Sequence, residues 1–257
     1  MRIARFAKGD GVAYGVVEGE GSETGLSLTI AELHGHPFGT QPGGVRYTGN
    51  RYPLAEVRLL APVLPSKVVA VAGNYESAGE PSIYLKPSTS VTGPGDRIAW
   101  PVKLTERVEY EGELAVIIGR LCREVPRERA EDVIFGYACA NDVTARDLLV
   151  RDGQWTRAKG FDTFCPLGPW METGTDPADL ELVTTVNGEE RQRARTSSLR
   201  WDVPSIIAYV SQVMTLLPGD VLLTGTPAGA GPLAEGDEVS VTISTIGTLT
   251  NKVVIRD

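Results

Sequence analysis

Short runs of β-branched and apolar residues, each ended by glycine or proline, recur from one end of this sequence to the other. The 257 residues include 29 Gly and 17 Pro, and both residue types favour turns over the interior of a helix or strand. Such runs predict strands at residues 2–6, 11–17, 67–72, 81–86, 109–119, 133–140, 180–186, 221–224, 239–243 and 248–254. Together they predict a β-dominated α+β fold.

Residues 203–214 form the clearest helical segment. Ile206, Ile207 and Val210 recur at helical spacing, and Asp202, just before the segment, fits an N-cap. Shorter helical segments are predicted at residues 27–33, 126–132 and 143–149.

The first part of the chain is predicted to form a small N-terminal domain, residues 1–56, ahead of a main domain, residues 57–257. Residues 41–49 are rich in glycine and predict a loop or linker. His34 and His36 lie just before this loop. Two histidines one residue apart could bind a metal, but the Gly and Pro residues around them indicate a turn.

The charge balance restricts the partners of the protein. The formal net charge is −8 at pH 7 and the pI is about 5.0, which argues against nucleic acid or an anionic membrane surface as a partner. No apolar run is long enough to span a membrane. An anionic substrate would therefore need a local cation, either a metal or a few Lys and Arg side chains.

The cysteines point to a reducing compartment. Cys122, Cys139 and Cys165 are odd in number and far apart, without the paired spacing of a zinc site. The N-terminus lacks the apolar core of a signal peptide. We therefore predict reduced thiols and a cytoplasmic location.

An acidic pair stands at the head of the strand predicted at residues 109–119. Residues two apart on a strand project from the same face, so Glu111 and Glu113 should lie side by side. A further acid, Asp142, follows the strand predicted at residues 133–140. Because hard divalent cations take carboxylate oxygens, these three residues predict a Mg²⁺ or Mn²⁺ site. The residues alone leave one alternative open, a solvated acidic strand start.

Five motifs in one order give the sequence a family resemblance. They are Tyr110-Glu111-Gly112-Glu113-Leu114, Asn141-Asp142-Val143-Thr144-Ala145-Arg146-Asp147, Ala158-Lys159-Gly160-Phe161-Asp162, Pro166-Leu167-Gly168-Pro169-Trp170, and Pro218-Gly219-Asp220 with Thr224-Gly225-Thr226-Pro227. Over about residues 57–257 the sequence resembles the fumarylacetoacetate hydrolase family. It is most similar to the small bacterial members described as 2-hydroxyhepta-2,4-diene-1,7-dioate isomerases or oxaloacetate decarboxylases. The N-terminal part also looks like that of those members.

The resemblance implies a fold and a cofactor. The fold is the rolled mixed β-sandwich of the family with a small N-terminal domain appended, usually as a homodimer. The cofactor is a divalent cation, Mg²⁺, Mn²⁺ or Ca²⁺, held by Glu111, Glu113 and Asp142. Glu109 is then interpreted as a solvated strand start.

The resemblance also implies the substrate and the groups that act on it. The substrate is a small 2-oxo or enol (di)carboxylic acid, and Thr226 helps to hold its carboxylate. Lys159 and Arg146 are the catalytic and substrate-binding groups, although Arg146 could instead form an ion pair with an acidic metal ligand. The implied reaction is C–C bond cleavage, by hydrolysis or decarboxylation, through a metal-stabilised enolate. The alternatives are an isomerase, or a metal-binding family member without catalysis.

The sequence departs from the family pattern at two places. Family members carry a His and a Glu after an Asn-Tyr pair, on a short helix that acts as a lid and supplies a general base. Here Asn74-Tyr75 runs directly into Glu76, with no such His, and Leu149 stands where Gln is common. The absent His counts against hydrolysis and isomerisation, which both need a positioned proton-transfer group, and least against decarboxylation.

Two explanations of the absent lid predict different masses for the intact protein. Either the lid is deleted, or residues between Asn74 and Gly79 are missing from the printed sequence. The close match elsewhere and the small polar residues that flank this point favour the second explanation. Mass spectrometry of the intact protein separates them, because a mass close to 27.5 kDa means that nothing is missing and a larger mass means that a lid exists.

Overall fold

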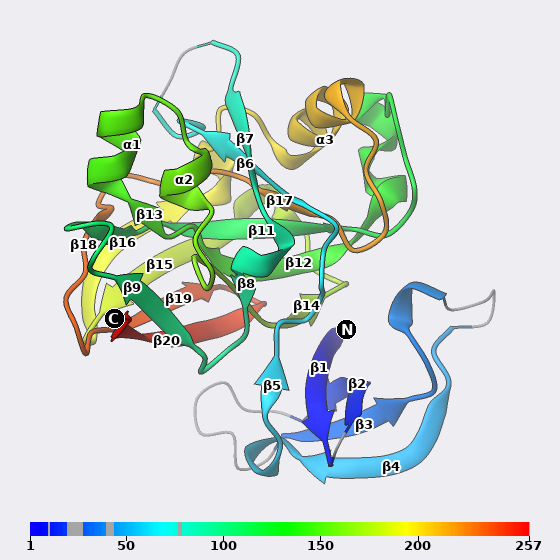
Figure 1. Cartoon of the computed structure of the whole chain (residues 1–257). Coiled ribbons are helices and arrows are strands. Elements are labelled where there is room, and N and C mark those ends of the chain that lie inside the picture. Colours follow the sequence, from blue (N-terminus) through cyan, green and yellow to red (C-terminus); the bar gives the residue numbers. More distant parts are fainter. Residues whose placement is uncertain (10, 20–27, 40–43, 77–78, 257) are drawn as a thin grey trace.

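A long mixed sheet carries the fold from the N-terminus to the centre of the molecule (Figure 1). The computed structural model describes residues 1–9, 11–19, 28–39, 44–76 and 79–256. The strands of this sheet are β1 (Arg2–Lys8), β2 (Gly11–Glu18), β3 (Thr29–Leu33), β4 (Tyr47–Pro53), β5 (Leu59–Leu60), β6 (Val68–Ala72), β7 (Ser82–Lys86), β8 (Val91–Thr92), β11 (Gly112–Ile118), β12 (Ile134–Asn141), β14 (Cys165–Glu172) and β17 (Val221–Leu223). Among the described residues their order is β4-β3-β2-β1-β14-β12-β11-β17-β6-β7, with β5 paired to β1 and β8 to β14.

Two further sheets lie within the described part of the chain, and the predicted β-dominated fold is confirmed. The larger has the order β16-β15-β19-β20-β9, and the smaller has the order β13-β10-β18. Their strands are β9 (Arg97–Pro101), β10 (Val108–Tyr110), β13 (Thr144–Ala145), β15 (Glu181–Val186), β16 (Glu189–Arg195), β18 (Gly231–Pro232), β19 (Glu238–Ile243) and β20 (Gly247–Arg256).

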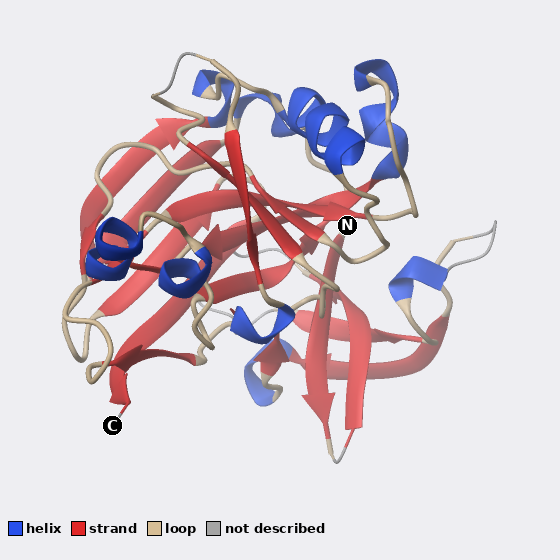
Figure 2. Ribbon diagram, turned by 45° about the horizontal axis from the view of Figure 1, so that its top comes forward, coloured by secondary structure: helices blue, strands red, loops and turns tan. Residues whose placement is uncertain are grey.

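The predicted helix at residues 203–214 is confirmed as α3 (Val203–Val213). The Asp202 carboxylate accepts a hydrogen bond from the Ser205 N–H at 3.0 Å and so caps the helix. The remaining helices are α1 (Arg146–Asp152), α2 (Thr156–Lys159) and the 3₁₀ helices η1 (Pro37–Gly39), η2 (Leu54–Glu56), η3 (Ser88–Ser90), η4 (Arg127–Val133), η5 (Pro177–Asp179) and η6 (Thr196–Ser198). Figure 2 shows the helices around the outside of the strands.

Strand β11 is buried on both faces, which explains its unbroken apolar run. Leu114 and Val116 pack in a core with residues of β15, β19 and α3. Ala115 and Ile117, which point the other way, pack in a second core with residues of β1, β6 and β14. The strand that carries the acidic pair is therefore held from both sides.

The N-terminal strands belong to the same sheet as the central strands of the main domain. Strand β1 pairs with β14 through Arg2 opposite Glu172 and Ile3 opposite Met171. Phe6 lies in a small core with Trp170 of the same β14. No helix of the described residues is long and apolar enough to cross a membrane.

The predicted helix at residues 27–33 is wrong where the structure describes it. Residues Thr29–Leu33 form β3, which pairs with β2 on one side and β4 on the other. A short apolar run fits a helix or a buried strand equally well, and here pairing with two neighbouring strands makes the segment a strand. The loop predicted at residues 41–49 ends earlier than expected, since β4 begins at Tyr47, and residues 41–43 lie outside the described residues.

Two other short segments differ in detail from their predictions. The helix start predicted at residues 126–132 is the 3₁₀ helix η4. In the segment predicted helical at residues 143–149, two residues pair as β13, and α1 begins only at Arg146.

Asp220, from one of the five motifs, joins β17 to β6 through a fully buried carboxylate. Its Oδ1 accepts hydrogen bonds from the Ser66 hydroxyl at 2.6 Å and the Lys67 N–H at 3.2 Å. Its Oδ2 accepts one from the Leu217 N–H at 2.8 Å and forms an ion pair with the Lys67 ammonium. Removing this carboxylate would leave several partly buried donors without a protein partner.

We expect Asp220→Ala to lower the free energy of unfolding by about 1–3 kcal/mol, because it leaves partly buried hydrogen-bond donors without their acceptor. Urea denaturation at neutral pH measures this change. Asp132, whose exposed carboxylate pairs with Arg129 at 2.9 Å, is the matched control, and Asp132→Ala should change stability by no more than about 0.5 kcal/mol. Equal losses in the two variants would contradict this role for Asp220.

Candidate metal centre

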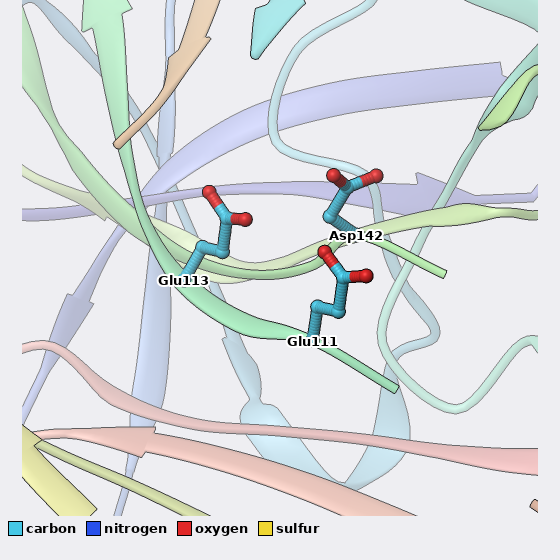
Figure 3. Close-up of side chains that lie close together, drawn as sticks. All are labelled: Glu111, Glu113 and Asp142. Carbon is cyan, nitrogen blue, oxygen red and sulfur yellow. The ribbon is translucent and has the colours of Figure 1, made fainter. Parts of the chain in front are cut away.

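Three carboxylates converge where β11 and β12 meet (Figure 3). Gly112 of β11 pairs with Asn141 of β12. Glu111 and Glu113 flank Gly112 along the chain, and Asp142 directly follows Asn141, so this one pair brings the three acids together. One oxygen from each carboxylate lies within 4.8 Å of the others. The predicted grouping of these three residues is therefore present, and their carboxyl groups point in the same direction.

The backbone of the cluster is fixed by its neighbours. The Asn141 side-chain oxygen accepts a hydrogen bond from the Glu111 N–H at 2.9 Å, and the Asp142 N–H donates to the Glu111 carbonyl at 2.8 Å. The Glu113 carboxylate accepts one from the Gly225 N–H at 2.6 Å. The three acidic side chains thus start from rigid positions.

Two buried lysines balance part of the negative charge. The Lys159 ammonium lies 2.8 Å from Glu111 Oε2 and 2.7 Å from Asp142 Oδ2. The Lys86 ammonium lies 2.5 Å from Asp142 Oδ1 and 3.2 Å from the Val143 carbonyl. Both lysine side chains are almost fully excluded from solvent. Three carboxylates against two ammonium groups leave a buried deficit of positive charge.

The pKa values of Glu113 and Asp142 shift in opposite directions. Burial, together with the charges of Asp142 and Glu111, raises the pKa of Glu113 well above its usual value. Burial alone would also raise the pKa of Asp142, but Lys159 and Lys86 outweigh it and lower that pKa. Glu113 is therefore the acid with the least compensation from the lysines. A divalent cation among the three carboxylates would supply the missing charge, so the donor set fits such an ion.

Lys159 lies where the sequence predicted it. Burial alone would lower the pKa of its ammonium group, but the carboxylates of Asp142 and Glu111 outweigh burial and raise it. The side chain remains charged and lines the same cavity as Glu111 and Glu113.

Arg146 also lines the cavity, and it forms an ion pair with an acid outside the metal cluster. Its Nε lies 3.8 Å from Glu109 Oε2. Glu109 is only 5% exposed and also pairs with Arg107, whose Nε lies 2.7 Å from Glu109 Oε1. The interpretation of Glu109 as a solvated strand start is therefore wrong, because two guanidinium groups neutralise its buried carboxylate.

Thr226 lies at the cavity wall with its hydroxyl already hydrogen-bonded. The hydroxyl donates to the Gly112 carbonyl at 2.9 Å and accepts from the Gln192 side-chain N–H at 2.9 Å. Its contact with a substrate carboxylate remains a prediction.

The cavity that these residues line has a volume of about 440 Å³. Apolar side chains, among them Leu149 and Trp155, form part of its wall. A larger cavity of about 570 Å³ lies near the start of α3, but it contains none of the residues of the acidic cluster. The chemistry therefore points to the smaller cavity.

Sequence reasoning missed Tyr84 and Lys86. The Tyr84 hydroxyl donates to Asp142 Oδ2, beside the Lys86 contact with Oδ1 of the same group. The signal for both lay in the strand predicted at residues 81–86, where two polar side chains two apart share one face.

The segment that departs from the family pattern begins beside the cavity. The Asn74 side chain donates to the Thr224 and Trp201 carbonyls, each at 2.9 Å. Residues 77–78 lie outside the described residues, so the absent lid stays a prediction. Neither His34 nor His36 joins a group of metal-ligating side chains within the described part of the chain.

Comparison with known proteins assigns the chain to a family. Residues 65–254 match the family described as fumarylacetoacetate (FAA) hydrolase C-terminal, and residues 1–62 match an Rv2993c-like N-terminal domain. The chain therefore belongs to the fumarylacetoacetate hydrolase family, whose members are enzymes. The predicted resemblance and fold are confirmed.

Three relatives illustrate the range of that family. Protein Rv2993c of Mycobacterium tuberculosis is 53% identical over 266 residues, covering 99% of this chain and 98% of its own. The structure of a 2-hydroxyhepta-2,4-diene-1,7-dioate isomerase from Mycobacterium marinum is 54% identical with a TM-score of 0.94, covering 100% of this chain and 99% of its own. A maleylpyruvate hydrolase from Sphingobium sp. SYK-6, solved with manganese(II) and pyruvate, is 36% identical with a TM-score of 0.82, and both chains are covered completely.

The match to Rv2993c also bears on the absent lid. It spans 266 aligned positions, whereas this chain has 257 residues, so the relative carries at least nine residues that this chain lacks. The alignment length gives no position for these residues, so the absent lid stays a prediction.

We expect Glu113→Gln to weaken Mn²⁺ binding by at least about a hundredfold, because it removes one of three anionic ligands. Isothermal titration calorimetry, with Mn²⁺ added to the chelator-treated protein, measures this affinity. In the absence of metal the variant should be at least as stable as the natural protein, since the neutral amide relieves repulsion and can still accept from Gly225 N–H.

Glu76 provides the matched control, because it lines the same cavity outside the cluster. Glu76→Gln should retain Mn²⁺ binding. A Glu113→Gln variant that binds Mn²⁺ as tightly as the control, or that is strongly destabilised without metal, would show that the cluster is structural.

Proposed function

We propose that this protein is a divalent-metal-dependent enzyme that cleaves a C–C bond of a 2-oxo or enol (di)carboxylic acid, as a hydrolase or a decarboxylase. The observation that carries the proposal is the convergence of Glu111, Glu113 and Asp142 beside Lys159 in one cavity. The manganese and pyruvate in the structure of the related maleylpyruvate hydrolase support it.

Glu111, Glu113 and Asp142 are the residues that would hold the cation, as Mg²⁺ or Mn²⁺, with Ca²⁺ a further candidate. A cation bound there would polarise the oxygens of a 2-oxo acid and stabilise the negative charge of an enolate. The remaining work falls to side chains of the chain itself.

Lys159 supplies a fixed positive charge in the cavity. Its ammonium group is held by two carboxylates, so it is oriented before substrate arrives and needs little reorganisation. We assign it the stabilisation of negative charge that develops on the substrate oxygen. Burial beside two acids keeps the group protonated, which suits a hydrogen-bond donor better than a base.

Arg146 and Thr226 are the proposed contacts to substrate carboxylates. The Arg146 Nε lies 3.8 Å from Glu109, so this pairing is loose and leaves guanidinium N–H groups for a ligand. Tyr84, Leu149 and Trp155 line the same cavity, and their rings and methyl groups would keep bulk water from the reacting carbon atoms.

Isomerisation is the second candidate reaction. The M. marinum relative, which is 54% identical, is described as a 2-hydroxyhepta-2,4-diene-1,7-dioate isomerase. An isomerase must move a proton between carbon atoms, and the segment after Tyr75 lacks the His that family members place there. A metal-binding protein without catalysis is the third candidate, because the absent His would also leave the site without a general base.

We also propose a cytoplasmic homodimer with a small 2-oxo acid as substrate and no nucleic-acid or membrane partner. The net charge of −8 supports the absence of nucleic-acid and membrane partners, and the free cysteines support the cytoplasmic location. Light scattering in solution would report a mass near twice 27.5 kDa for the dimer.

A substrate panel separates the three candidates. Oxaloacetate, an acylpyruvate and a hydroxymuconate-type diacid are each incubated with the protein, with Mg²⁺ or Mn²⁺ and with chelator, and followed by NMR. We expect metal-dependent loss of carbon dioxide from oxaloacetate or cleavage of the acylpyruvate. A double-bond shift without cleavage would favour the isomerase, and no turnover of any compound would favour the non-catalytic protein.

We expect Lys159→Met to lower kcat by about 10²–10³-fold, as is typical for loss of one preorganised donor to a developing oxyanion. Metal affinity should change far less than kcat. Lys252→Met, at an exposed position on β20, is the control and should leave kcat unchanged. A Lys159→Met enzyme with normal kcat would remove Lys159 from the mechanism.

A further inference from the structure

Strand β16 carries one fully buried residue, and that residue is polar. Gln192 is 1% exposed, while the other residues of this edge strand are exposed or half-buried. A long polar side chain is costly to bury unless its hydrogen bonds are satisfied. The position of Gln192 therefore calls for an explanation.

The Gln192 amide makes three hydrogen bonds to two other segments. Its Oε1 accepts from the Gly112 N–H at 2.9 Å. Its Nε2 donates to the Thr226 hydroxyl at 2.9 Å and to the Pro227 carbonyl at 2.8 Å. The side chain thus connects the acidic strand to the loop that follows β17.

Regular pairing with the buried Thr184 directs Gln192 inward, and a β-bulge lies next to it at Arg191. Thr184 of β15 pairs with Gln192, but the next residue, Thr185, pairs with Glu190, so the register shifts past Arg191. Bulges of this kind re-aim side chains and are common beside active sites.

The hairpin also lies close to the acidic strand. A Cβ on Gly112 would come within 2.0 Å of the Thr184 hydroxyl and 3.2 Å of Gln192 Oε1. Glycine at this position therefore permits the hydrogen bond between the two strands, because any side chain would push them apart.

Gly112 stands between two of the three acids of the cluster. Its N–H donates to Gln192, and its carbonyl accepts from the Thr226 hydroxyl. Since Gln192 also donates to Thr226, the two side chains hold both polar groups of Gly112 in one closed network. Any rotation of this backbone would turn Glu111 and Glu113 away from Asp142.

We propose that Gln192 is a positioning residue for the metal centre, which sets the spacing of Glu111 and Glu113 by holding Gly112 and Thr226 together. The inference rests on the proposed function. An amide suits this place because it donates and accepts at once and adds no charge. A glutamate there could not donate to Thr226 or Pro227 and would bring a further negative charge to the acidic cluster.

The test is the affinity of the substrate-free, full-length protein for Mn²⁺, measured from the electron paramagnetic resonance signal of the free ion. Gln192→Met keeps the length of the side chain and removes its hydrogen bonds. We expect a 10–100-fold weaker affinity, the range typical for residues that orient metal ligands. Gln212→Met, at an exposed site on α3, is the matched control and should bind as the natural protein does.

Thr226→Val tests the other side of the same network and stays informative if Gln192→Met does not fold. It should also weaken Mn²⁺ binding, and the double variant should lose less than the product of the two single losses, because both disrupt one network. Unchanged affinity in Gln192→Met, or in Thr226→Val where the first variant does not fold, would overturn the inference. So would a lower melting temperature with unchanged affinity.

The failure of the inference is distinguishable from that of the proposed function. If the natural protein does not bind Mn²⁺, the proposed function falls and takes the inference with it. If the natural protein and the variants bind Mn²⁺ equally well, the proposed function stands and the role of Gln192 falls alone.

Discussion

The rest of the site depends on the convergence of three carboxylates at one point, two of them buried and the third, that of Glu111, partly so. Like charges that close repel, and burial removes the water that would screen them. Lys86 and Lys159 offset part of this charge, and the raised pKa of Glu113 marks the part that they do not offset. A site of this composition is costly for a stable fold and suitable for a divalent cation. We therefore interpret the uncompensated negative charge of the cluster as the basis of metal binding.

The scaffold explains how the chain tolerates such a cluster. Strand β11 is packed by apolar side chains on both faces, and β12 holds its head in register. The side-chain oxygens of Asn141 and Gln192 accept hydrogen bonds from this backbone, and the Gly225 N–H donates to the Glu113 carboxylate. The unfavourable charge is thus confined to a segment that has little freedom to move away from it.

The sequence predicted those parts of the protein that follow from local pattern. Strand periodicity placed Glu111 and Glu113 on one face. The helix α3 followed from its apolar spacing and its cap. Asp142 followed from its place after the strand at residues 133–140, whereas Lys159 came only from the family motifs, because no local pattern brings it to the same place.

The rest depended on tertiary contacts. Strand β3 was mistaken for a helix because its partners, β2 and β4, lie elsewhere in the sequence. Glu109 was assigned to solvent because its burial results from Arg107 and Arg146, one of them 37 positions away along the chain. Lys86 is not found from the sequence because a lysine near a strand end is normally exposed, and its burial depends on Asp142 and the Val143 carbonyl, which lie far along the chain.

The most direct test of the account is anomalous diffraction from crystals of the chelator-treated protein soaked in Mn²⁺. We predict one strong manganese peak, bounded by the carboxylates of Glu111, Glu113 and Asp142. A cavity without manganese, or a peak only at surface carboxylates such as Asp132, would contradict the central claim that this acidic cluster is a metal centre.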